Sequence, residues 1–262
     1  MDSEKKKEIA DVRNYYVVKA NELIQQSRFS LSMQEQKIIL YLITKIKPDD
    51  KEFHLYEFNI QEFCEVCGIN SYNGKNYVNL KQTIKTLANK SNWVMINRFG
   101  EECEALLRWI EKAYISHKSG TIKIRLDDDM KPFLLELKSH FTTYNLCYTL
   151  TMKSKYSIRI YELLKSYEYK KECVFEIEEL KKILGAENYN SYKDFRVNVI
   201  NVAINEINEI SDIYVTYSAE KNGRKYARIQ FDISAKTDTL ERVAAYKKIH
   251  ERLNPNKNNK EG

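Results

Sequence analysis

Two stretches of the sequence place amide and basic side chains on the polar side of an amphipathic helix. The first helix is predicted over 77–89, and the cations and amides on it or just ahead of it include Lys75, Asn76, Lys81 and Lys85. Lysine neutralises phosphate groups, and asparagine forms paired hydrogen bonds with the edge of adenine. No acidic residue occurs on this helix, although acids usually favour a first turn. Its positive end is therefore suited to phosphate.

The second stretch is a helix predicted over 194–209. Lys193 and Arg196 stand at its start, and Asn198 belongs to its polar stripe. An arginine at this end of a helix inserted into the major groove can form a bidentate pair with guanine. An ion pair between Arg196 and Asp194 or a neighbouring residue is the alternative.

Further cations flank this second helix on both sides. Lys153, Lys155 and Arg159 lie near the start of an earlier predicted helix, and Arg224 and Lys225 follow a glycine turn in a later hairpin. We expect both groups to contact a phosphate backbone. The alternative for each is an ordinary solvated surface.

Residues for catalysis or metal binding lack partners at the required spacing. Cys64 and Cys67 form a CxxC pair, but no second CxxC or HxxxH completes a zinc site, so we expect both thiols in the core. No GxxxxGK[ST] phosphate loop and no recognisable nucleophile motif occurs. Metal-assisted DNA cleavage lacks a His-x-His pair, because the histidines are isolated: His54, His117, His140 and His250. We therefore expect no enzyme activity, no metal and no cofactor.

The bulk composition is that of a globular chain with a mild excess of positive charge. Of 262 residues, 43 are basic, 37 are acidic and 43% are hydrophobic, with a formal net charge of +6. The basic residues gather in blocks, which favours a nucleic-acid footprint over scattered lysines. No apolar run suits a signal peptide or a membrane span, so we expect a cytoplasmic protein with reduced cysteines and no membrane partner.

The sequence repeats itself with a period near 120 residues. The segment "FNIQEFCEVCGINSY" (58–72) is similar to "FEIEELKKILGAENY" (175–189) at an offset of 117. On either side, an offset of 120 pairs residues of like type: Ile38 with Ile158, Tyr41 with Tyr161, Ile84 with Ile204, and Leu87 with Ile207. A period of this length indicates a duplicated domain.

Each copy has the same order of elements: a helix, a short strand, a short helix ending at glycine, a third helix and a β-hairpin. We expect them at 33–45, 52–58, 61–66, 77–89 and 93–126, and again at 154–167, 173–177, 177–184, 194–209 and 212–233. This is the winged helix-turn-helix plan, whose third helix can enter a major groove. The predicted fold class is α+β, with tandem winged-helix domains at 1–148 and 149–236, related by internal duplication, and an accessory basic helix with a disordered tail at 237–262.

Three segments resemble one family of proteins. "YSIRIYELLKSY" (156–167), "FEIEELKKILG" (175–185) and "VVKANELIQQSRFSLSMQEQKIILYLITKI" (17–46) are similar to the theta-type plasmid replication initiators that bind iterons, and the similarity covers roughly 15–235. The resemblance implies two winged-helix domains. It implies monomers that bind directly repeated origin sites in double-stranded DNA, help to open A/T-rich DNA and recruit host replication proteins such as a helicase or initiator. It also implies dimers, held largely by the N-terminal domain, that repress their own gene.

The resemblance places the DNA-facing positions on the second reading helix and, secondarily, in the wing and the linking helix: Lys193, Arg196 and Asn198, then Arg224, Lys225, Lys155 and Arg159. The sequence departs from the family pattern after Arg196. A second basic residue and a proline common there appear as Asn198 and Val202 or its neighbours.

Two other classes of protein fit the same residues. A tandem winged-helix transcriptional regulator would bind similar DNA without origin activity, and a scaffold would use winged helices for protein contacts alone. The residues by themselves do not separate an initiator from a regulator, whereas the resemblance favours an initiator.

Overall fold

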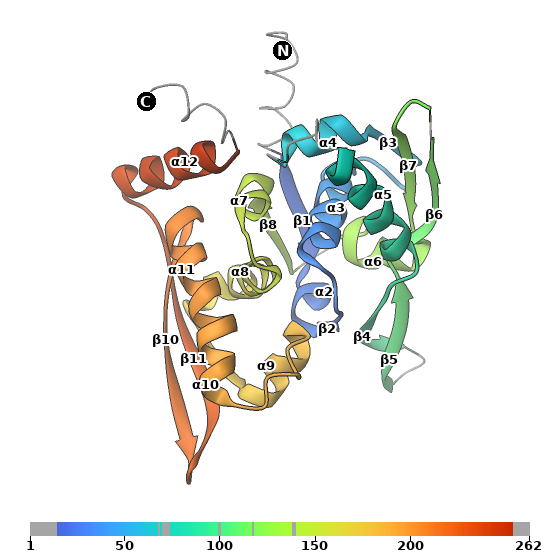
Figure 1. Cartoon of the computed structure of the whole chain (residues 1–262). Coiled ribbons are helices and arrows are strands. Elements are labelled where there is room, and N and C mark those ends of the chain that lie inside the picture. The colour runs from blue at the N-terminus through green and yellow to red at the C-terminus, as the bar shows by residue number, and fades with distance from the viewer. Residues whose placement is uncertain are drawn as a thin grey trace.

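The computed structural model describes residues 15–67, 69, 74–98, 101–116, 118–137 and 140–253, and of 74–77 and 97–98 it describes the backbone only. Helices and small antiparallel sheets form two halves that meet at a central helix, α8 (Lys155–Tyr167) (Figure 1). The predicted α+β class is confirmed.

The first half alternates helices with short strands. Its elements in chain order are β1 (Tyr16–Ala20), α2 (Asn21–Gln26), β2 (Ser27–Arg28), α3 (Met33–Ile43), β3 (Tyr56–Asn59), α4 (Ile60–Val66), α5 (Gly74–Ala88), β4 (Ser91–Arg98), β5 (Glu101–Arg108), β6 (Ile110–Ile115), β7 (Thr121–Leu126), a 3-10 turn (Asp128–Met130), α6 (Lys131–Leu134), β8 (Phe141–Asn145) and α7 (Leu146–Thr151). The three predicted helices are confirmed as α3, α4 and α5. Gly68, predicted to end α4, lies outside the described residues.

The second half repeats the plan. After α8 come a 3-10 turn (Glu168–Lys170), β9 (Glu172–Glu176), α9 (Ile177–Leu184), α10 (Tyr192–Phe195), a π-helical turn (Arg196–Ile200), α11 (Asn201–Ile210), β10 (Ile213–Asn222), β11 (Lys225–Ala235) and α12 (Thr239–Leu253). The helix predicted over 194–209 is thus one continuous run with a π turn inside it. Gly185 ends α9 with φ +58°, as predicted, and a Cβ there would stand 3.1 Å from the Phe29 carbonyl oxygen.

The sheets show the duplication and one correction to it. The order β9-β11-β10 in the second half matches the order β3-β7-β6 in the first. The hairpin predicted over 93–126 is two hairpins instead, because β5 pairs with β4 in a different sheet from β6 and β7. Trp109 separates β5 from β6; its ring is buried and meets Phe29 edge-on at 5.5 Å. This buried anchor bends the strand, so β6 and β7 form the wing of the first half.

Helix α8 is buried on nearly all sides, which is unusual for a helix with this many polar residues. Its apolar residues Ile158 and Leu163 are fully buried, and so are Arg159 and Glu162. It packs against α2, α3 and β8 of the first half and against α9, α11 and β11 of the second. The serine before it, Ser154, caps its first turn by accepting a hydrogen bond from the Tyr156 amide. Helix α8 is therefore a shared core element of both halves.

The cysteines lie where a packing role places them. Cys64 and Cys67 are both buried, which confirms the predicted core position of the CxxC pair. Burial raises the pKa of the Cys64 thiol to about 11, so it stays protonated at neutral pH. No helix within the described ranges is both long and apolar enough to cross a membrane.

Candidate nucleic-acid interface

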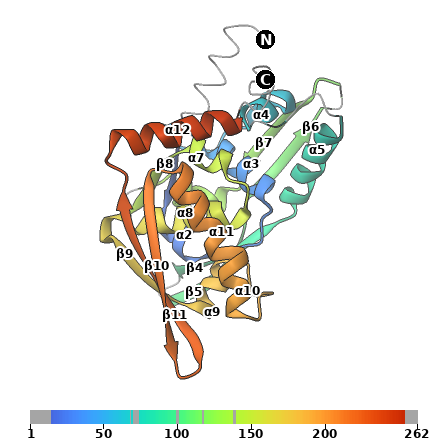
Figure 2. The same cartoon turned by 60° about the vertical axis from the view of Figure 1, so that its left-hand side comes forward.

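The run α10–α11 buries one face and presents the other to solvent. The buried face consists of apolar residues: Phe195, Val199, Ile200, Ala203, Ile204 and Ile207. Ser191 caps the run by accepting hydrogen bonds from the amides of Lys193 and Asp194. The predicted contact residues Lys193, Arg196 and Asn198 are all exposed. Figure 2 shows α10 and α11 beside the long hairpin β10–β11.

Arg196 lies within the run α10–α11, called the second reading helix, and near the hairpin β10–β11. Burial raises the pKa of Tyr192 and Tyr217, and the Arg196 guanidinium beside them opposes that rise. Within the described part of the chain no ion pair joins Arg196 to Asp194 or to a neighbouring acid, so the alternative role for this arginine is not seen. The guanidinium is therefore available at the surface for a ligand.

The wing is the long hairpin β10–β11, and its tip is cationic. Asn222 pairs with Lys225 across a turn in which Gly223 has φ +63°, and Arg224 and Lys225 are exposed. Next to the tip, Tyr226 stacks on Tyr192 of α10, with ring centroids 4.1 Å apart and planes 26° apart. This stack ties the wing to the reading helix, so both present their cations together.

We expect Lys225→Ala to weaken binding to all DNA sequences about equally. If the side chain neutralises one phosphate, the slope of log affinity against log salt falls by about one unit. Titrations of the full chain with duplex DNA at several salt concentrations measure that slope. Lys247→Ala, on the exposed side of α12, removes the same charge away from the wing and serves as the control. Equal slopes for Lys225→Ala and the parent would contradict the contact.

Helix α5 occupies the equivalent place in the first half. Leu80, Ile84 and Leu87 are buried, as its helical spacing predicts. Lys85 is exposed and Lys81 is half-buried on the outward side. The side chains of two other predicted contact residues lie outside the described part of the structure: Lys75 and Asn76.

The structure contradicts a DNA contact for Arg159. Its side chain is 2% exposed and points into the core, where Nη2 donates hydrogen bonds to the carbonyl oxygen and hydroxyl of Ser27, at 2.8 and 3.0 Å. Its guanidinium lies 4.7 Å from the ring centre of Phe29. Burial lowers the pKa of Arg159 to about 10, so it remains a cation at neutral pH. Arg159 joins α8 to the first half instead of reaching DNA.

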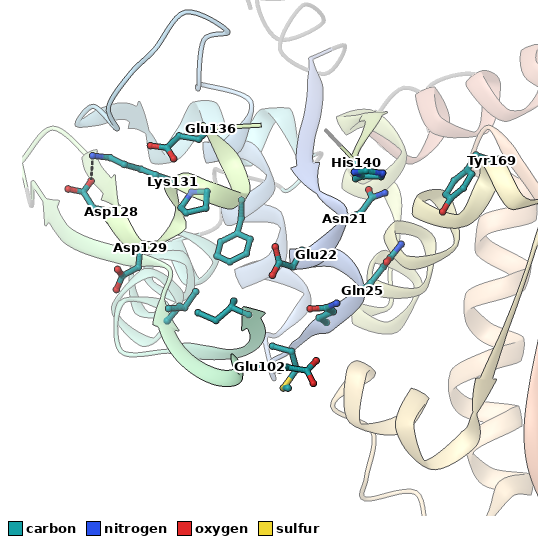
Figure 3. A pocket seen from close by; sticks show the side chains of 16 residues that line it. Asn21, Glu22, Gln25, Glu102, Asp128, Asp129, Lys131, Glu136, His140 and Tyr169 are labelled. Atoms are coloured by element: carbon teal, nitrogen blue, oxygen red, sulfur yellow. Dashed lines mark ion pairs between the residues drawn. The ribbon is translucent and has the colours of Figure 1, made fainter. Parts of the chain in front are cut away.

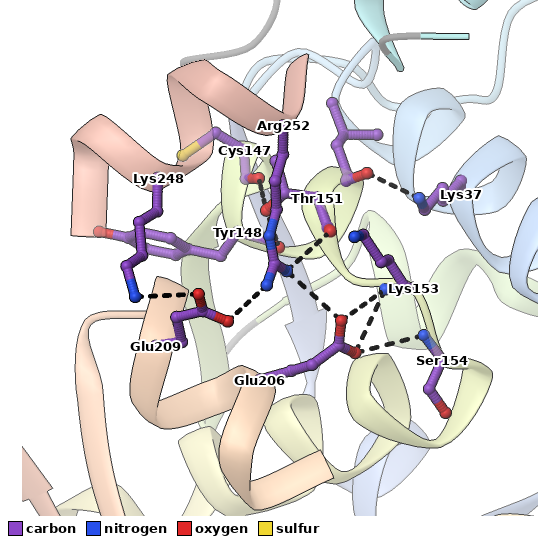
Figure 4. Close-up of polar contacts among 11 residues, drawn as sticks. Lys37, Cys147, Tyr148, Thr151, Lys153, Ser154, Glu206, Glu209, Lys248 and Arg252 are labelled. Carbon is purple, nitrogen blue, oxygen red and sulfur yellow. Dashed lines mark hydrogen bonds and ion pairs between the residues drawn. The ribbon is translucent and has the colours of Figure 1, made fainter. Parts of the chain in front are cut away.

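Lys153 and Lys155 lie at the start of α8, with different surroundings. The Lys153 side chain is exposed, but its backbone amide donates to the Glu206 carboxylate at 3.0 and 3.2 Å (Figure 4). Lys155 is half-buried, and its ammonium lies 4.8 Å from the ring centre of Tyr156. Lys153 is therefore the more accessible of the two for a phosphate.

Helix α12 braces the segment that joins the halves. Its Arg252 pairs with Glu206 at 3.4 Å and with Glu209, and donates a hydrogen bond to the Thr151 carbonyl oxygen at 3.3 Å (Figure 4). Lys248 pairs with Glu209 at 3.0 Å. A helix is present where the accessory segment was predicted, and its contacts give it a structural role; the bounds of that segment stay a prediction. The predicted tail beyond residue 253 lies outside the described residues.

A cavity of about 770 Å³ lies apart from this interface, between α2, α6 and the β4–β5 strands (Figure 3). Its lining is acidic, with Glu22, Glu102, Asp129 and Glu136 among the carboxylates. A fifth carboxylate of the lining, that of Asp128, pairs with Lys131. Such a surface repels a phosphate backbone, so the cavity is not part of the nucleic-acid interface. Among the described residues, no group of three or more His, Cys, Asp or Glu side chains could hold a metal ion.

The sequence analysis did not predict the apolar residues on the solvent-exposed faces of α5 and of the run α10–α11. Val78 on α5 is 62% exposed, Val197 is 45% exposed and Val202 is 39% exposed. The signal was present in the sequence, because each valine falls at a polar position of an amphipathic helix. The Tyr192–Tyr226 stack, which joins distant segments, had no such signal.

Sequence models of one family match both halves of the chain. Residues 16–165 match the model described as "Initiator Replication protein, WH1", and residues 176–233 match "Initiator Rep protein, WH2". The chain belongs to the initiator replication protein family. Two winged-helix domains are thereby confirmed. The first match ends at residue 165 and the second begins at residue 176. The domain boundary predicted after residue 148 stays a prediction.

Two known proteins are similar to this chain. A replication initiation protein of Escherichia coli is 29% identical over 189 residues, which are 69% of this chain. The chain spans 57% of that protein's length. The crystal structure of Pi initiator protein in complex with iteron DNA shares the fold, with a TM-score of 0.68 at 22% identity over 86% of this chain and 99% of that one.

Proposed function

We propose that this chain initiates plasmid replication by binding directly repeated sites, or iterons, in double-stranded origin DNA. One observation carries the proposal: in each winged-helix half the third helix buries its apolar face and exposes a polar, cation-bearing face. Membership of the initiator family supports a role in replication initiation. The solved structure with the same fold is that of an initiator in complex with iteron DNA.

The candidate contact residues divide by chemistry into two roles. Arg196 and Asn198 lie on the outward face of the second reading helix, where a bidentate guanidinium reads guanine and an amide reads adenine. Flexible cations around them neutralise the backbone and fix the register. These phosphate contacts are Lys193, Arg224, Lys225, Lys153 and Lys155 in the second half, with Lys81, Lys85, Lys75 and the amide Asn76 in the first.

Later steps of initiation use other surfaces. Opening of A/T-rich DNA and recruitment of host replication proteins, such as a helicase or initiator, follow from bound monomers. Dimers repress the chain's own gene through the first half. Support for such dimers comes from Trp93 and Leu106, a cross-strand pair on β4 and β5 that is 48% and 56% exposed. Strand β5 lies at the edge of its sheet among the described strands, where a second copy can pair.

The proposed activity needs binding energy alone. Contacts with DNA drive the separation of A/T-rich strands, so the chain needs no catalysis, metal or cofactor. It acts in the cytoplasm. A nuclease assay with added divalent metal checks this part directly, and cleavage of duplex DNA would contradict it.

A footprint on the DNA that flanks the gene tests the proposed function. The full chain is expected to protect a series of short sites in direct orientation, at constant spacing. A plasmid that carries those sites is then expected to replicate only when the chain is supplied. Protected sites without replication would favour the tandem winged-helix regulator. No protection of any duplex at moderate salt would overturn DNA binding and favour a scaffold.

A further inference from the structure

Both reading helices expose the same dipeptide at the same place. Val78 and Asn79 on α5 are exposed, as are Val197 and Asn198 in the second half. The next residue is buried in each case: Leu80 in the first helix and Val199 in the second.

This equivalence is hidden in the sequence because the spacing changes inside the helix. The dipeptides are 119 residues apart, whereas Ile84 and Ile204 on the buried face are 120 apart. The π-helical turn Arg196–Ile200 accounts for the extra residue, since a π turn lengthens one helical turn by one residue. Where the first helix buries Leu80 alone, the second buries two residues in succession.

The two side chains of the dipeptide suit an A·T base pair. In the major groove, adenine offers N6 and N7 to a bidentate amide, and thymine offers the groove's apolar group, its C5 methyl. A valine exposed singly on a protein surface needs no explanation. Here, however, the same residue recurs beside an asparagine on both helices that face DNA in the proposed function.

The second helix shows the amide already oriented. The Asn198 side chain donates from Nδ2 to the Asp194 carbonyl oxygen at 2.9 Å. That bond uses one of the two amide hydrogens and leaves Oδ1 and the other N–H for a base. Val202 lies four residues on, on the same side of the helix, and is also exposed. The apolar surface thus extends along the face beside the amide.

We propose that Val78–Asn79 and Val197–Asn198 are specificity-determining pairs, each reading an adenine edge and a neighbouring thymine methyl. The two halves of each DNA site therefore share a short A·T element. This inference rests on the proposed function, because both helices must enter a major groove. It adds the identity of the base pairs that the two helices contact.

Replacement of thymine by deoxyuridine tests the inference without altering the protein. The full chain is used to select duplexes from a pool with a random core, and the tightest duplex is resynthesised with dU at one thymine at a time. Deoxyuridine keeps every Watson–Crick bond and removes the C5 methyl. We expect about a fourfold loss of affinity at each thymine that meets a valine, from one buried methyl.

A double-mutant cycle assigns the methyl to its valine. At one thymine in the second half, Val197→Ala and dU are expected to weaken binding by similar factors, and the combination is expected to weaken it no further. Val78→Ala should do the same at one thymine in the first half. Val243→Ala, an exposed valine of α12, is the matched control and should change nothing.

Two results separate this inference from the function beneath it. If selection yields a defined sequence but every dU duplex binds like its parent, the valine–thymine contact is overturned and the proposed function stands. If selection enriches no sequence, sequence-specific binding itself is overturned.

Discussion

Replacing Glu162 with alanine is expected to lower the free energy of unfolding by about 3–5 kcal/mol. The Glu162 carboxylate is buried in α8, where it pairs with the Lys19 ammonium and accepts a hydrogen bond from the Tyr144 hydroxyl. Burial lowers the pKa of Lys19, and Glu162 opposes that change. Alanine would leave a buried cation and a buried hydroxyl without their partner.

Urea unfolding followed by circular dichroism measures the loss. The control is Glu57→Ala, which breaks the 2.9 Å pair with Lys123 on the surface. That change should cost at most about 1 kcal/mol, because both partners are well hydrated. If the two variants unfold at the same urea concentration, the buried pair does not stabilise the fold more than the surface pair does.

Replacing Arg196 with alanine is expected to weaken specific binding by about 1–3 kcal/mol, or roughly 5- to 150-fold. The side chain is exposed at the start of the π turn, beside Tyr192 and Tyr217 and next to the wing. Affinity for the selected duplex and for random duplex is measured under one salt condition. The ratio of the two affinities is expected to fall.

Arg196→Lys separates base reading from charge. Lysine keeps the positive charge but lacks the planar fork that pairs with guanine. We therefore expect Arg196→Lys to retain non-specific affinity and lose specificity. A lysine variant with the parent's full specificity ratio would show that Arg196 contacts phosphate instead.

The duplication made much of the fold predictable from sequence. Buried residues recur at helical spacing in both copies, as in Leu87 and Ile207, and such periodicity survives divergence because a core must be filled. The turn at Gly223 was predictable for a different reason, since its positive φ favours glycine. These signals are local, so they located the helices, the second wing and most of its exposed cations.

The errors came from contacts between distant segments. Arg159 has the sequence signature of a surface cation, and only the fold shows that Ser27 and Phe29 enclose it. The bend at Trp109 likewise depends on Phe29, far away in sequence. The π turn is a one-residue insertion that leaves the buried stripe almost unchanged, so periodicity did not reveal it.

The shared position of α8 has a consequence for the length of the DNA target. Because both halves pack on this one helix, neither can swivel independently about a linker. Each base pair added between the two contacted grooves rotates the far groove by about 34° around the DNA axis. A rigidly joined pair of readers cannot follow that rotation. If both halves bind DNA as proposed, the packing of the protein's core fixes the separation of the two grooves, and the bound sites can vary more in base sequence than in spacing.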